Sequence, residues 1–107
     1  MKRFGQLINV RPESIDEYER LHAAPWPGVL DQIRRSSLRN YSIFREGNQL
    51  FAYFEYVGDD FAADMATMAA DPETQRWWAL TDAMQEPLPD RDPGSWWKTL
   101  REVFHTD

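Results

Sequence analysis

Two consecutive strand patterns joined by a short turn constrain the fold of this chain more than any other feature. Residues 49–57 are rich in aromatic side chains and have the strongest strand pattern in the sequence. Residues 39–46, which include Tyr41, have a second strand pattern, and Gly47 and Asn48 between the two are typical turn residues. The pair therefore predicts an antiparallel hairpin, and hence a sheet that is at least partly antiparallel.

Proline and capping residues divide the rest of the chain into short elements. Strands are predicted at 4–10 and 100–105, and a proline-rich loop at 85–95. Helices are predicted at 13–23, 28–36, 60–70 and 72–84. The segment Gly58-Asp59-Asp60 is expected to supply the cap of the third, and Asp71 is expected to cap the fourth. The order strand–helix–strand–strand–helix–strand is the ferredoxin-like plan of an α+β domain. A chain of 107 residues is expected to form a single domain, 1–107.

Charge and composition exclude several classes of function. The net charge of −6, from 18 acidic and 12 basic residues, argues against nucleic acid or an anionic membrane surface as a partner. The chain has no cysteine, so neither disulfides nor thiolate ligands are expected. Lys2 and Arg3 are not followed by an apolar run, so no signal peptide or membrane span is predicted and a cytoplasmic location is expected.

Two histidines, His22 and His105, are the only imidazoles in the chain. Neither has metal-ligand spacing, and the sequence has no phosphate-binding loop and no nucleophile motif, so no metal and no cofactor are predicted. Tyr18 and His22 lie four residues apart, on one face of the predicted helix. Histidine titrates near neutral pH, which makes His22 the candidate for cofactor-free proton transfer. The residues alone leave open the alternative of a half-buried structural histidine.

Aromatic residues make up 14% of the chain, and five of them are tryptophans, which suit a core, an interface or a sugar pocket. Trp77 and Trp78 are neighbours on a helix and point about 100° apart, so one is expected in the core and at most one in a pocket. Packing is the ordinary role for Tyr41 on a strand. Trp96 and Trp97 are expected in a core or at an interface.

Six short segments, taken in order, carry a family signature. They are Asp16-Glu17-Tyr18 with His22, Trp26-Pro27, Asn40-Tyr41-Ser42-Ile43-Phe44, Gln75-Arg76-Trp77-Trp78, Thr81-Asp82-Ala83-Met84 and Glu102-Val103-Phe104-His105. Each segment is weak alone, but their order and spacing are specific. By these segments the chain resembles the L-rhamnose mutarotase family over essentially its full length.

The resemblance implies a homodimeric α+β barrel, made by two ferredoxin-like subunits that pack sheet to sheet. It also implies cofactor-free epimerisation at the anomeric carbon of a 6-deoxy-hexose, L-rhamnose or a related sugar. His22 matches the family's proton donor, and Tyr18, Tyr41, Trp77 and Trp78 match its sugar-binding positions. Ring opening needs a proton delivered to the ring oxygen and another removed from the anomeric hydroxyl. His22 is expected to deliver the first, and Tyr18 either orients the sugar or relays a proton.

The loop 85–95 and the Trp96-Trp97 pair depart from the best-known members of the family and are expected to widen or reshape the pocket rim. The sequence therefore leaves the sugar open, with L-fucose or another 6-deoxy sugar as an alternative. Two other functions also stay open. A cofactor-free monooxygenase acting on an aromatic substrate would use the same kind of barrel and a lone histidine, and would consume oxygen. A non-catalytic sugar-binding domain would not depend on His22. Since one fold hosts many functions, only the site residues favour the mutarotase.

Overall fold

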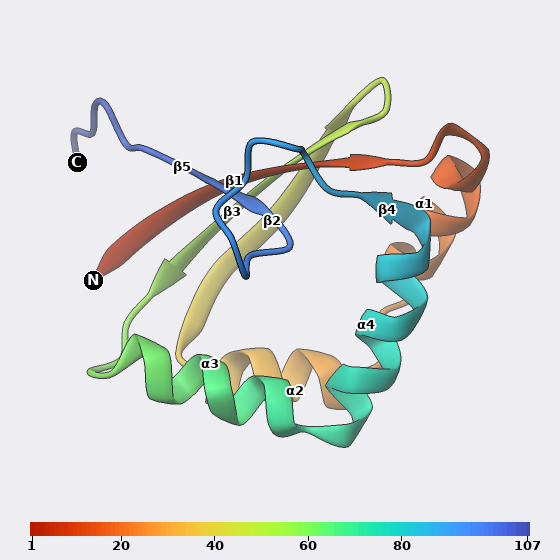
Figure 1. The fold of residues 1–107 in the computed structure, drawn as a ribbon. Coiled ribbons are helices and arrows are strands. Elements are labelled where there is room, and N and C mark those ends of the chain that lie inside the picture. Colours follow the sequence, from red (N-terminus) through yellow and green to blue (C-terminus); the bar gives the residue numbers. More distant parts are fainter.

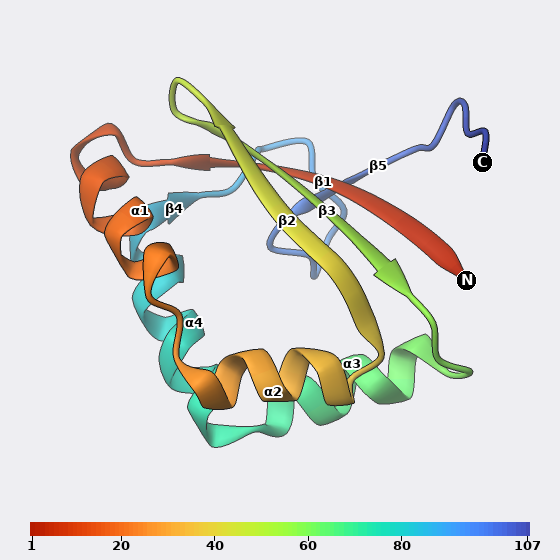
Figure 2. The ribbon, with the colours of Figure 1, turned by 180° about the vertical axis from the view of Figure 1, so that it is seen from behind.

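A computed structural model describes all residues, 1–107, and has the α+β fold that the sequence predicts (Figure 1). The strands are β1 (Lys2–Val10), β2 (Leu38–Glu46), β3 (Gln49–Tyr56), β4 (Gln85–Glu86) and β5 (Lys98–Leu100). The helices are the 3-10 turn η1 (Pro12–Ser14), α1 (Ile15–Ala23), α2 (Pro27–Arg35), α3 (Phe61–Ala70) and α4 (Pro72–Met84). Figures 1 and 2 show the four α-helices gathered on one side of the sheet.

The sheet is antiparallel with the strand order β2-β3-β1-β4, which is the ferredoxin-like order. β1 is its central strand and pairs with β3 along nearly its whole length, from Lys2 opposite Tyr56 to Asn9 opposite Gln49. Two short strands share the other edge of β1, with β5 opposite its middle and β4 opposite its end. The predicted hairpin of β2 and β3 is therefore confirmed and extended by β1.

The predicted final strand at 100–105 is wrong in its position. β5 covers Lys98–Leu100, and residues 101–107 have no regular structure. Leu100 already pairs with Gly5, close to the start of β1 at Lys2, so an antiparallel strand running beyond residue 103 would have no partner. Val103 and Phe104 are accordingly exposed.

The loop predicted at 85–95 begins later than expected. Gln85 and Glu86 form β4, because their backbone pairs with the end of β1 at Val10 and Asn9. The chain then has no regular structure until β5 begins at Lys98. As part of β4, Gln85 is buried, with only 3% of the residue exposed.

The core occupies the face of the sheet that the helices cover. On β3 the alternate residues Leu50, Ala52, Phe54 and Tyr56 are buried, as the two-residue period of a strand requires. The buried apolar side chains form two clusters. One contains Ile8, Val10, Tyr18 and Leu50, and the other contains Leu38, Phe54, Tyr56 and Met68.

Helices α3 and α4 begin at aspartate caps, Asp71 as predicted and Asp60 from within the predicted segment Gly58-Asp59-Asp60. The side chain of Asp60 accepts the backbone N–H of Ala63 at the start of α3, and that of Asp71 accepts the N–H of Thr74 at the start of α4. Each cap of this kind stabilises a helix by about 0.5–2 kcal/mol. Even α4, the longest helix with 13 residues, falls short of a bilayer, and no helix has the length and apolarity to cross one.

Candidate active site

A cavity of about 850 Å³ lies between the sheet and the helices. It brings together all five residues singled out in the sequence: Tyr18 and His22 from α1, Tyr41 from β2, and Trp77 and Trp78 from α4. This volume is in the range of about 300–1,000 Å³ that is usual for small-molecule sites. The sequence therefore identified side chains that the fold does place around one space.

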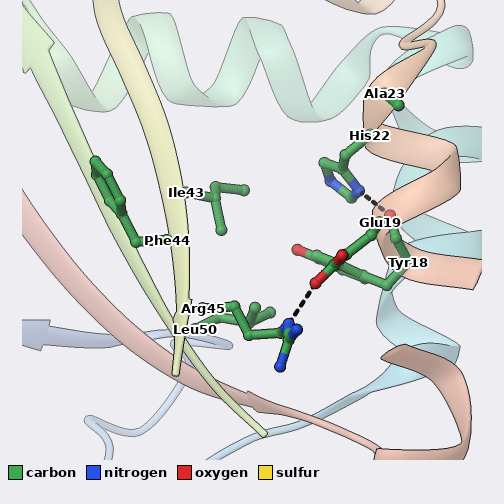
Figure 3. Close-up of a pocket in the computed structure, with 8 residues that line it drawn as sticks. All are labelled: Tyr18, Glu19, His22, Ala23, Ile43, Phe44, Arg45 and Leu50. Atoms are coloured by element: carbon green, nitrogen blue, oxygen red, sulfur yellow. Dashed lines mark hydrogen bonds and ion pairs between the residues drawn. The ribbon is translucent and has the colours of Figure 1, made fainter. Parts of the chain in front are cut away.

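A smaller hollow of about 520 Å³ adjoins this cavity and shares Tyr18, His22 and Ile43 with it. Figure 3 shows Tyr18 and His22 reaching from α1 toward β2, with Ile43 facing them. An ion pair between Arg45 of β2 and Glu19 of α1 borders the hollow and ties the helix to the edge strand (Figure 3). Tyr18 and His22 thus line both spaces.

The hydrogen bond of His22 determines which of its ring nitrogens can do chemistry. Nδ1 lies 2.8 Å from the backbone carbonyl of Tyr18, and a carbonyl oxygen can only accept, so Nδ1 carries a hydrogen. In the neutral ring Nε2 then holds a lone pair. Burial lowers the pKa of His22 below its ordinary value of 6.5, against the opposing effect of the Tyr18 carbonyl. At pH 7 the ring is therefore mostly neutral and can accept a proton at Nε2.

Aromatic neighbours hold the His22 ring in place. The Tyr18 ring stacks on it with a centroid distance of 4.1 Å, and Trp77 meets it edge-on at 5.2 Å. Trp26 packs edge-on against Trp77, with 5.3 Å between the ring centroids, and so helps to hold Trp77 in place. Trp26 lies in the segment Trp26-Pro27 of the family signature, but the sequence did not assign it to the site.

The adjacent tryptophans of α4 divide their roles as their helical geometry predicts. Trp77 is only 7% exposed and braces His22, whereas Trp78 is 36% exposed and keeps an accessible ring surface. Both line the cavity, although helix geometry predicts at most one of them in a pocket. Trp78 is therefore the better placed of the two for stacking on a ligand.

A bulge in β2 sets the position of Tyr41. The register between β2 and β3 shifts between Arg39 and Ser42, and Asn40 adopts a φ of 53°. Asparagine tolerates this left-handed conformation, and bulges often redirect a side chain next to a site. Tyr41 lines the cavity together with Ile43 and packs on Phe54 at 5.3 Å between ring centroids. Although part of its ring is accessible, burial raises the pKa of Tyr41 to about 12.

Two polar residues of the site were missed by the sequence. Gln85 is buried, and its Nε2 donates a hydrogen bond to the Tyr18 hydroxyl at 3.1 Å. The local sequence predicts a loop at Gln85 and contains no sign of a strand. Asp82 is the only carboxylate that lines the larger cavity, and burial raises its pKa. It lies in the family segment Thr81-Asp82-Ala83-Met84, which was the one available signal.

The loop before β5 supplies part of the cavity wall. Trp96 and Trp97 both line the cavity, which agrees with the expectation of a reshaped pocket rim rather than with a role in the core or at an interface alone. Trp97 also packs against the core cluster of Ile8, whereas the indole N–H of Trp96 donates to Oε1 of Gln85 at 2.8 Å. The structure contains no group of three or more His, Cys, Asp or Glu side chains that could hold a metal ion.

Comparison with known proteins gives a consistent result. A family model described as L-rhamnose mutarotase matches residues 3–106. The L-rhamnose mutarotase of Oceanobacillus iheyensis is 35% identical to this chain over the full length of both. The solved structure of an L-rhamnose mutarotase from Formosa agariphila superposes with a TM-score of 0.78 at 23% identity, again over all of both chains. Tetracenomycin F2 cyclase from Streptomyces glaucescens superposes with a TM-score of 0.68 at 14% identity, over 99% of this chain and 96% of the cyclase, and shares the fold alone.

Proposed function

This chain belongs to the L-rhamnose mutarotase family, and from that premise we propose that its cavity interconverts the α and β anomers of L-rhamnose with His22 as the group that transfers the proton. The observation that carries this assignment is the hydrogen bond between Nδ1 of His22 and the Tyr18 carbonyl. It leaves Nε2 as the free nitrogen of a half-buried, neutral imidazole that lines the cavity. A base of this kind suits a reaction that moves protons and needs no cofactor.

The reaction requires two proton movements in each direction. Nε2 of His22 takes the proton of the anomeric hydroxyl, the bond between C1 and the ring oxygen breaks, and a second group that donates a hydrogen bond in the cavity gives its proton to the ring oxygen. The open aldehyde then rotates about C1–C2, and closure on the other face reverses both transfers. Because the ring of His22 is neutral, it is better suited to accept the proton of the anomeric hydroxyl than to deliver a proton to the ring oxygen, as the sequence predicted. His22 is then the proton donor of the closing half of the cycle.

The walls of the cavity suit a 6-deoxy sugar. The exposed ring surface of Trp78 and the apolar residues around it offer contacts for the C–H faces and the methyl group. Asp82 can accept hydrogen bonds from sugar hydroxyls, and Tyr41 stays protonated in the neutral range and can donate one. This mixture of apolar walls and a few polar groups is usual for small-molecule sites.

Proton NMR of anomer exchange tests the proposal with the unmodified protein. L-Rhamnose is expected to exchange faster than in buffer, L-fucose tests the tolerance for other 6-deoxy sugars, and D-glucose carries the extra 6-hydroxyl. Acceleration for none of the three sugars would contradict the proposal. Oxygen uptake with a phenolic substrate would then favour a monooxygenase, and sugar binding without exchange would favour a binding domain.

The pH dependence should report the protonation state of His22. Because the neutral ring is the form that takes the first proton, kcat/KM should be constant above neutral pH. It should fall as the pH drops through the pKa of His22, which burial places below 6.5. Exchange rates measured from about pH 4.5 to 8.5, with the buffer-catalysed rate subtracted, give this profile. A rate that rises toward acid pH would contradict the role of His22 as the first proton acceptor.

We also propose that two copies of the chain pair through the sheet face that the helices leave bare, as the family resemblance implies. Phe44, Phe51 and Leu7 lie opposite one another across β2, β3 and β1 and form an apolar row. They alternate along their strands with Ile43, Leu50 and Ile8, which face the helices. Phe44 is 65% and Phe51 39% exposed, although both sit within a regular sheet. A second copy would cover the row by presenting the same row in return.

A further inference from the structure

We propose that Gln85 and Trp96 are positioning residues that set the direction of the Tyr18 hydroxyl proton, so that Tyr18 donates to the sugar. The inference rests on the proposed function, because it assigns a role to Tyr18 within the same reaction. It comes from a chain of two hydrogen bonds that joins the loop before β5 to helix α1 through β4.

The two hydrogen bonds that join Trp96, Gln85 and Tyr18 are consistent with only one donor–acceptor direction. An indole N–H can donate but cannot accept, so Trp96 must meet the oxygen of the Gln85 amide, and Oε1 lies 2.8 Å from it. The amide nitrogen of Gln85 then faces Tyr18, with Nε2 3.1 Å from the hydroxyl oxygen. The orientation of a glutamine amide is normally ambiguous, but here the donor-only indole determines it.

Tyr18 therefore receives a hydrogen bond on its oxygen, and its own proton must point elsewhere. No protein group accepts this proton: among the hydrogen bonds of the chain, the Tyr18 hydroxyl appears only as the acceptor from Gln85. Tyr18 and Gln85 are each 3% exposed, so their side chains are largely shielded from bulk water. Tyr18 lines both cavities, and a sugar oxygen bound there is the acceptor that the arrangement lacks.

This direction assigns complementary roles to the stacked pair on α1. His22 presents a lone pair at Nε2 and takes the proton of the anomeric hydroxyl, whereas Tyr18 presents a proton to the ring oxygen as the bond to C1 breaks. A donor aimed at an oxygen that gains negative charge in the transition state lowers the barrier. Burial raises the pKa of Tyr18, which keeps the hydroxyl protonated throughout the neutral range. With the Gln85 amide reversed, Tyr18 would donate to Gln85 and present only lone pairs to the sugar, so the ring oxygen would lose its donor.

Two substitutions at Gln85 distinguish a residue that orients the Tyr18 proton from one that only stabilises the local structure. In Gln85→Glu a carboxylate can accept from both Trp96 and Tyr18, which keeps two hydrogen bonds but turns the Tyr18 proton away from the sugar. We expect kcat for L-rhamnose exchange to fall about 100-fold with little change in KM. Gln85→Met removes both hydrogen bonds but leaves the hydroxyl free to rotate toward the sugar, so we expect a loss below about 10-fold. A purely structural role predicts the opposite ranking.

Trp96→Phe tests the same inference without any change of charge. It removes the donor that orients the amide, so kcat should fall less than about 10-fold. Adding Trp96→Phe to Gln85→Met should cost nothing further, because the amide it would orient is already gone. This pair of variants also keeps the inference testable if Gln85→Glu fails to fold, as judged by circular dichroism.

The outcomes separate the two proposals. An unmodified protein that leaves every sugar at its buffer rate overturns the proposed function. An active unmodified protein together with a Gln85→Glu variant of equal kcat, or with Gln85→Met slower than Gln85→Glu, overturns only the role of Gln85. Additive effects of Trp96→Phe and Gln85→Met would overturn the role of Trp96.

Discussion

His22→Asn is expected to lower kcat/KM for L-rhamnose exchange by about 10²–10⁴-fold, the usual contribution of a general acid–base. In the unmodified protein, Nδ1 of His22 donates to the Tyr18 carbonyl at 2.8 Å. The asparagine amide can donate to the same carbonyl, so the local structure should be retained. It has no group that titrates near neutral pH, so the proton of the anomeric hydroxyl loses its acceptor. NMR exchange of the anomers at pH 7.5 measures the effect in a pH range where His22 is neutral.

The other histidine provides a matched control. His105 lies in the C-terminal residues without regular structure and contacts the carboxylate of Asp107 at 2.9 Å, away from the cavity. His105→Asn should therefore keep the exchange rate of the unmodified protein. If His22→Asn also keeps its rate to within about threefold, the proton acceptor is another group, and Asp82 is the next residue to substitute.

Phe51→Glu is expected to convert a dimer into a monomer. Phe51 stands in the middle of the apolar row, between Phe44 on β2 and Leu7 on β1. A two-fold interface contains each substituted residue twice, so one change buries two unpaired carboxylates. The cost of several kcal/mol for each buried charge should raise the dimer dissociation constant at least about 100-fold. Sedimentation velocity over a range of protein concentrations measures this shift.

Leu80→Glu is the control for this test. Leu80 is 43% exposed, close to the 39% of Phe51, but it lies on α4 rather than on the bare face of the sheet. It adds the same charge and removes a similar apolar side chain, so it should leave the dimer intact. A monomeric unmodified protein would contradict the proposed pairing, and so would a Phe51→Glu variant that associates as strongly as Leu80→Glu.

Most secondary structure was predictable because it depends on signals close together in the chain. The hairpin of β2 and β3 follows from two strand patterns around Gly47-Asn48, and α3 and α4 begin at their aspartate caps. The bounds of β4 and β5, which pair with the same edge of β1, were not predictable in the same way. Whether Gln85 or Arg101 belongs to a strand depends on where β1 ends and begins. The sequence around these residues does not specify how they align with β1.

The candidate site likewise combines features that depend on local sequence with features that depend on the tertiary structure. The sequence by itself determined the Tyr18–His22 pair, since four residues of helix place both side chains on one face, and it determined the separation of Trp77 from Trp78. Only the tertiary structure decided which nitrogen of His22 is free, that burial lowers its pKa, and that Trp96 is linked to Tyr18 through Gln85. Helix geometry repeats over a few residues, whereas burial and long-range hydrogen bonds arise from segments that meet only when the chain has folded.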